Sequence, residues 1–118
     1  MSISAAQYSK FCSEVAQKRC VFTFTEQGGL LIYPVQGQEV LPFWSSRSRL
    51  EKIQASHPKY QRYQIAEYSW PEFESRLHQM EGDGIHAGVN WSGQRLTGYN
   101  VAAAELRAAL EYQMRSQA

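Results

Sequence analysis

Two tryptophans each end a strand-like segment next to a serine, and they are the strongest candidates for recognition chemistry in this chain. Trp44 is followed closely by Arg47, and Trp91 directly follows Asn90. Indole rings beside guanidinium and amide groups are typical of binding sites, because they combine a large rigid surface with polar edges. We therefore predict a binding surface made of Trp44, Arg47, Asn90 and Trp91. The alternative is that both indoles pack over the rim of the core.

A second hypothesis gives His86 and Asn90 a catalytic role on a polar metabolite. The two residues are four apart in a predicted strand, so they share a face with Gly88, where a shallow polar depression would open beside Trp91. Histidine titrates near neutral pH and can act as a general acid or base. Because the sequence ties no carboxylate or serine to this pair, we predict no catalytic residue. The question of enzymatic activity stays open, with its absence favoured.

Charge is distributed unevenly along the middle of the chain. Residues 47–62 include five basic side chains and one acid, whereas residues 64–83 include five acids and one arginine. Basic residues interleaved with Tyr60 and Tyr63 are compatible with single-stranded nucleic-acid binding, which combines phosphate contacts with base stacking. The whole chain, however, has a formal net charge of only +1, which disfavours nucleic acid as the partner. The favoured interpretation is that both blocks are solvated helix faces that partly neutralise each other.

Neither metal nor thiol chemistry is indicated. His57, His78 and His86 are scattered without cysteine or carboxylate at metal-ligand spacing, so we predict no metal and no cofactor. Cys12 and Cys20 lie in a predicted helix and at its end, about 12 Å apart along the helix axis, which is beyond the reach of a disulfide. We expect two free, buried thiols in a reducing compartment.

Length and composition limit the class of protein. The chain has 118 residues, of which 43% are hydrophobic, and this suffices for one domain over residues 1–118 with a single core. Its apolar runs fall far short of the ~20 residues that cross a bilayer, and its N-terminus lacks the pattern of an export signal. We expect a soluble cytoplasmic protein without membrane contact, whose partner is an unknown protein or small molecule. A homodimer is also compatible with the sequence.

The hydrophobic pattern predicts an α+β domain in which an antiparallel sheet packs against about four helices. Helices are predicted within 5–19, 45–55, 70–82 and 102–114. Strands are predicted within 21–25, 30–33, 39–43, 60–68, 85–91 and 95–101. Short glycine turns separate the first three strands and predict a meander, and the last two strands are expected to form a hairpin. Gly98 predicts a bulge or a close backbone approach in the last strand.

Two predicted helices begin with capping signals. Ser69, Pro71 and Glu72 supply an N-cap, a first-turn proline and a glutamate that can close a capping box. Ser48 and Glu51 have the same spacing and predict a capping box for the helix that ends near residue 55.

Together these segments resemble a known family. The motifs are a glycine-turn hairpin, Val-Leu-Pro-Phe-Trp-Ser at 40–45, a segment ending in Val-Asn-Trp at 84–91, Leu-Thr-Gly at 96–98 and Glu-Leu at 105–106. Over about 5–110 this pattern is similar to the uncharacterised bacterial family called domain of unknown function 2750. The resemblance implies a small cytoplasmic bacterial protein with no established activity, and it brings no catalytic residue. We therefore expect a non-catalytic protein-binding, ligand-binding or adaptor domain.

Overall fold

Helices and strands are interleaved along the chain in the computed structural model, which describes residues 3–117. The helical segments are α1 (Ile3–Lys18), α2 (Arg47–Ser56), the 3-10 turn η1 (Pro58–Arg62), α3 (Trp70–Asp83) and α4 (Ala103–Ser116). The strands are β1 (Cys20–Glu26), β2 (Gly29–Leu30), β3 (Tyr33–Val35), β4 (Gln38–Phe43), β5 (Gln64–Ser69), β6 (His86–Ser92) and β7 (Thr97–Ala102). The predicted α+β class is confirmed.

The strands form two small sheets, and their pairing differs from the predicted meander. One sheet is antiparallel with the order β2-β1-β5, and the other has the order β3-β4-β6-β7 with β4 and β6 parallel. β1 pairs with β5 over six residue pairs, whereas β2 has only two residues and β4 belongs to the second sheet. Phe22 and Trp44 join the sheets through two backbone hydrogen bonds of 2.8 Å. The meander prediction is therefore wrong, although the β6–β7 hairpin is confirmed.

One of the two predicted capping boxes forms. The Ser69 side chain accepts a hydrogen bond from the Glu72 backbone N–H, and Glu72 accepts one from the Ser69 backbone N–H. α2, however, begins directly after Ser46, so Ser48 lies inside the helix and its predicted capping box is absent. The Ser46 hydroxyl instead lies 3.2 Å from the Ser48 hydroxyl, which leaves the first turn of α2 without a side-chain cap.

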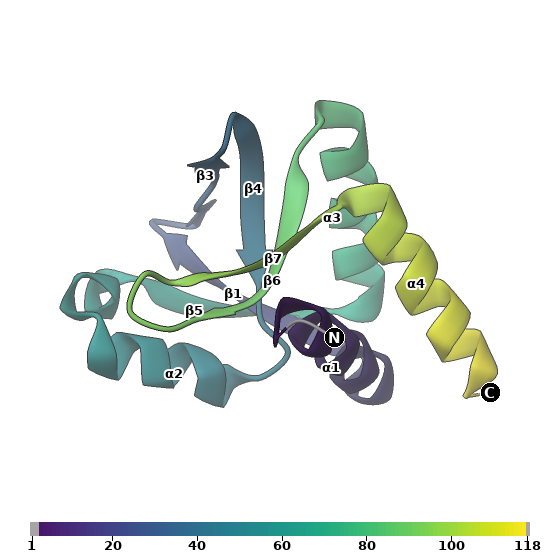
Figure 1. Cartoon of the computed structure of the whole chain (residues 1–118), viewed down its shortest axis with the longest axis horizontal. Coiled ribbons are helices and arrows are strands. Elements are labelled where there is room, and N and C mark those ends of the chain that lie inside the picture. The colour runs from purple at the N-terminus through teal and green to yellow at the C-terminus, as the bar shows by residue number, and fades with distance from the viewer. Residues whose placement is uncertain (1–2, 118) are drawn as a thin grey trace.

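Two hydrophobic clusters fill the molecule. The larger one joins α1, α3 and α4 to the second sheet and includes Phe11, Phe43, Phe73, Leu106 and Leu110. The smaller one lies among the two sheets, α2 and η1 and includes Phe24, Trp44, Leu50, Tyr60 and Trp91. Figure 1 shows α1, α3 and α4 at one end of the molecule and α2 at the other, beside the tip of the β6–β7 hairpin. Among residues 3–117, no helix is long and apolar enough to cross a membrane.

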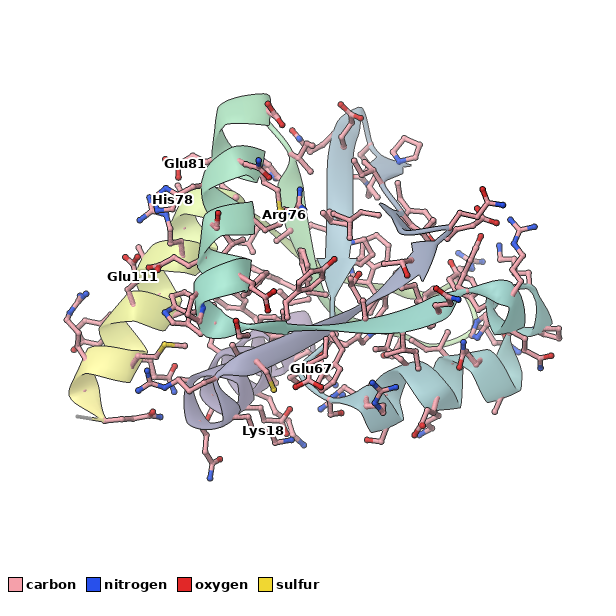
Figure 2. All side chains as sticks on the ribbon, turned by 180° about the vertical axis from the view of Figure 1, so that it is seen from behind. Lys18, Glu67, Arg76, His78, Glu81 and Glu111 are labelled. Atoms are coloured by element: carbon pink, nitrogen blue, oxygen red, sulfur yellow. The ribbon has the colours of Figure 1, made fainter. Side chains whose placement is uncertain are left out.

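The acidic block of α3 is partly neutralised by the last helix. Arg107 on α4 donates to Glu81 at 3.0 Å and to Glu111 at 3.4 Å, and Figure 2 shows His78, Glu81 and Glu111 along the side where α3 and α4 meet. A hydrogen bond with Glu111 raises the pKa of Glu74. These contacts tie the two helices together at the surface.

Candidate functional site

The four residues of the predicted binding surface lie in a different setting from the one expected. Trp44 is 1% exposed, Asn90 2% and Trp91 5%, so the indoles follow the alternative of packing in the core. Arg47 alone is exposed, and its guanidinium lies over the ring of Phe22 at 5.7 Å. The prediction of an exposed surface made by all four side chains is therefore corrected. The physical reason is that Trp44 forms the bridge between the sheets, where solvent is excluded.

The Trp91 indole is fixed by its surroundings. Its Nε1 donates to Asn100 Oδ1 at 2.8 Å, and its backbone carbonyl accepts a 2.8 Å hydrogen bond from Trp44 Nε1. The ring lies against Gly88 and Gly98, where an added Cβ would stand 2.5 Å and 2.8 Å from ring atoms. The predicted depression at Gly88 is thus filled by the indole, and the close approach predicted at Gly98 is confirmed.

The Asn90 side chain forms hydrogen bonds in the interior of the protein. Asn90 has a φ of 48°, and its Oδ1 accepts the Ser45 backbone N–H at 3.0 Å while its Nδ2 donates to Ser45 Oγ at 3.1 Å. The pairing of β6 with β7 is irregular between Val89 and Ser92, which accommodates this conformation. Because the side chain of Asn90 is occupied by Ser45, the pairing with His86 for acid–base chemistry gains no support.

We expect Asn90→Ala to lower the free energy of unfolding by about 3 kcal/mol. The left-handed backbone costs an L residue about 1–2 kcal/mol, and the buried Ser45 N–H would lose its partner at a further cost of about 1–3 kcal/mol. Urea denaturation measures the loss. Asn90→Gly is the matched control, since it loses the same hydrogen bonds without the strain and should cost about 1 kcal/mol less. Equal losses for the two variants would contradict a strained backbone at this position.

Ser45 also links the Asn90 side chain, through Glu14, to Arg49 on α2. Its hydroxyl donates to Glu14 Oε1, which lies 3.5 Å from Arg49 Nη2. Burial alone would raise the pKa of Glu14, but the Ser45 hydrogen bond and the charge of Arg49 outweigh it and lower the pKa. Glu14 therefore stays ionised near neutral pH and forms an ion pair with Arg49.

A groove lies between the N-terminal part of α1, α2 and the tip of the β6–β7 hairpin, which Figure 1 shows close to α2. We call it the basic groove. Its volume is about 670 Å³, a size typical of small-molecule sites. It is lined by Gln7, Arg49, Lys52, Ile53, Ser56, His57, Trp91, Ser92, Gly93 and Gln94.

Positive charge dominates the basic groove. Arg49 and Lys52 supply two cations, and none of the lining residues just named carries a carboxylate. The whole chain has 12 basic and 11 acidic residues, so the imbalance is local. Guanidinium and ammonium groups bind phosphate or carboxylate oxygens through charge-assisted hydrogen bonds. A counter-charge comes from Glu14, which lies outside the lining and pairs with Arg49 at 3.5 Å.

Two polar atoms of the lining residues are buried without a hydrogen-bond partner among the described residues. They are Gln7 Oε1 and His57 Nδ1. The other ring nitrogen, His57 Nε2, lies 3.0 Å from the Gln94 carbonyl oxygen; because a carbonyl only accepts, Nε2 carries a proton, and in the neutral imidazole Nδ1 then presents a lone pair. Unpartnered buried atoms cost about 1–3 kcal/mol each. Solvent or a ligand with donor groups would recover that cost at this site.

Sequence reasoning located part of this groove. Arg49 and Lys52 belong to the basic block, and Trp91 belongs to the predicted binding surface. Gln7 and Gln94 were missed, because the fold alone brings the first helix and the last hairpin to α2. No residue type or spacing in the sequence signals this meeting.

The geometry gives little support to the nucleic-acid alternative. Tyr60 is 4% exposed and packs against Phe24, so its ring is not displayed on the outer surface as a stacking platform for a nucleic-acid strand. Tyr63 is covered by the guanidinium of Arg62 at 5.0 Å, and Arg62 also pairs with Glu26 at 3.3 Å. The basic block is therefore divided among separate contacts and does not form one continuous stripe.

Fold and groove define an α+β protein with a basic, ligand-sized groove beside its smaller hydrophobic cluster. The chain belongs to the family described as Protein of unknown function (DUF2750), whose model matches residues 8–110. This match confirms the resemblance found in the sequence. No curated protein matches the chain.

Proposed function

We propose that this protein is a non-catalytic binding domain for a small anionic ligand, with the basic groove as its binding site. The observation that carries the proposal is the local charge: Arg49 and Lys52 face a ligand-sized space whose lining contains no carboxylate. Trp91 is the one member of the predicted binding surface that lines this space. The other three members would act indirectly. Trp44 and Asn90 would hold the β6–β7 hairpin in place through their hydrogen bonds. Arg47 would contribute by packing on the Phe22 ring.

We propose no catalytic step, because the side chains that line the basic groove include no activated nucleophile. The lining holds one histidine, His57, whose Nε2 is engaged by Gln94. Two serines, Ser56 and Ser92, are also present. The Ser56 hydroxyl donates to the Lys52 carbonyl oxygen at 2.8 Å, and no hydrogen bond within residues 3–117 joins the Ser92 hydroxyl to a base. None of these groups is placed as a nucleophile with an adjacent base. Binding is therefore the role that these side chains fit best.

We place this activity in the bacterial cytoplasm. The thiols of Cys12 and Cys20 are both free, as a reducing compartment favours. Burial raises the pKa of Cys12 to about 11, so that thiol is protonated at neutral pH and has no function as a nucleophile in this proposal.

The test is a titration of the isotopically labelled protein with inorganic phosphate, followed by amide chemical shifts. We expect shifts to concentrate at Lys52, His57 and Gly93, and the double variant Arg49→Gln/Lys52→Gln to weaken phosphate binding by at least about tenfold. Each lost charge-assisted hydrogen bond is worth about 1.5–3 kcal/mol, and about 1.4 kcal/mol is a factor of ten.

The matched control removes the same charge elsewhere. Lys18 and Arg76 lie outside the lining of the basic groove, and Figure 2 labels both. Lys18→Gln/Arg76→Gln should leave phosphate binding within about twofold of the wild type, since only weak long-range charge effects remain. A wild type without phosphate-dependent shifts, or an equal loss in both double variants, would contradict the proposal.

A further inference from the structure

A second, smaller hollow adjoins the basic groove on the other side of His57. Its volume is about 190 Å³. We call it the aromatic hollow, and it is lined by Tyr33, His57, Lys59, Tyr60, Trp91, Gln94, Arg95 and Leu96. Three of these residues, His57, Trp91 and Gln94, line the basic groove as well. The two spaces are thus neighbours, and the His57–Gln94 hydrogen bond of 3.0 Å lies at their common wall.

The chemistry of the aromatic hollow differs from that of the groove. Tyr33, Tyr60 and Trp91 contribute three rings, with the Tyr33 and Trp91 centroids 5.6 Å apart, and Leu96 adds an aliphatic side chain that is 8% exposed. A cavity of about 150 Å³ is enough to hold benzene. The aromatic hollow therefore has room for one six-membered ring and little more.

The polar groups of the hollow restrict how a ring would enter. The Tyr33 and Tyr60 hydroxyls lie 3.0 Å apart, so one donates to the other and the second proton is left for an acceptor. Burial raises the pKa of Tyr33, which keeps its hydroxyl protonated as a donor. Lys59 and Arg95 are exposed lining residues, and they extend the positive charge of the groove past His57.

We propose that the ligand of this protein is an anion that carries a single planar ring, such as a monoaryl phosphate or a compact heteroaryl phosphate. This inference rests on the proposed function. The anionic group lies in the basic groove with Arg49 and Lys52, and the ring enters the aromatic hollow, which Tyr33, Trp91 and Leu96 line. His57, Trp91 and Gln94 line both spaces, so the two parts of the ligand would meet beside these residues.

The experiment compares inorganic phosphate with phenyl phosphate by calorimetric and chemical-shift titration of the full chain. Phenyl phosphate should bind at least about tenfold more tightly, because burying one ring against aromatic side chains adds apolar contact to the same anion. Intermolecular nuclear Overhauser effects should connect the phenyl protons to the Leu96 methyl groups and the Trp91 indole. That second measurement requires no variant and is independent of any effect on folding.

Variants separate the ring site from the anion site. Tyr33→Leu removes a ring of the aromatic hollow. It should abolish most of the extra affinity of phenyl phosphate over inorganic phosphate, and the affinity for inorganic phosphate should stay within about twofold of the wild type. Tyr112→Leu is the matched control, because Tyr112 is 68% exposed on α4 and lies outside both linings. It should change neither affinity.

The outcomes distinguish this inference from the proposed function. If phosphate binds in the basic groove but phenyl phosphate binds no more tightly, the ring site is refuted and the anion site stands. Phenyl contacts that map away from Leu96 and Trp91, or a gain that survives Tyr33→Leu, also overturn the inference. Failure of both ligands to bind refutes the proposed function together with the ring site.

Discussion

Gly88→Ala is expected to lower the free energy of unfolding by about 3 kcal/mol, a large effect for one added methyl group. The new Cβ would stand 2.5 Å from Cε2 and Nε1 of the Trp91 indole. A retreat of that ring would break its Nε1 hydrogen bond to Asn100 and its packing against Tyr33. The backbone cannot shift either, since Gly88 pairs with strands on both sides. Urea denaturation followed by circular dichroism measures the change.

Gly82→Ala is the matched control for this substitution. Gly82 lies in the last turn of α3, where a Cβ would meet nothing within 4 Å, and alanine in a helix is more stable than glycine by about 0.5–1 kcal/mol. A small gain is therefore expected from the same chemical change. Gly88→Ala made in a Trp91→Ala background should cost much less than in the wild type. An unchanged cost there would show that the clash with the indole is not the cause.

Trp44→Ala is expected to be the most damaging substitution, with a loss of about 4 kcal/mol. The side chain is 1% exposed, its ring meets Phe24 edge-on at 5.4 Å, and Nε1 donates to the Trp91 carbonyl oxygen. Removing it opens a cavity at the bridge between the sheets and leaves that carbonyl unpaired. Thermal and urea denaturation measure the loss.

Trp44→Phe keeps most of the ring and tests the same position in a protein that should still fold. It removes the hydrogen bond to Trp91 and should cost about 2 kcal/mol, intermediate between wild type and alanine. A loss below about 1 kcal/mol for Trp44→Ala would be inconsistent with a buried indole. Such a small loss would instead support the exposed binding surface that the sequence predicted.

The sequence predicted the elements of this fold better than their arrangement. Ser69, Pro71 and Glu72 carry their signal locally, and the helix starts where they indicate. The pairing of β1 with β5 joins residues 39 to 49 positions apart, from Thr25 with Gln64 to Cys20 with Ser69, and no local pattern encodes it. Tyr60 was placed in a strand, but Pro58 begins a 3-10 turn that includes it, and β5 starts only at Gln64.

The candidate site was predictable only where its residues are clustered in the sequence. Arg49 and Lys52 stand out as part of a basic block on one helix. Packing of Trp44 in the core was one of two alternatives left open by the sequence, and the bridge between the two sheets decides it. Burial of Asn90 depends on its left-handed φ of 48°, which no local pattern encodes. Tryptophan at a strand end fits the rim and the interior equally well until the neighbouring strands are placed.

The packing of α1 against α4 has a consequence for biosynthesis. Phe11 and Val15 from α1 share the larger cluster with Leu106, Leu110 and Met114 from α4, so the two ends of the chain complete one interior. A nascent polypeptide on the ribosome cannot close that interior until α4 has left the exit tunnel. The native packing of α1 therefore has to wait for the synthesis of α4, and removing the last turns of α4 would expose the apolar face of α1.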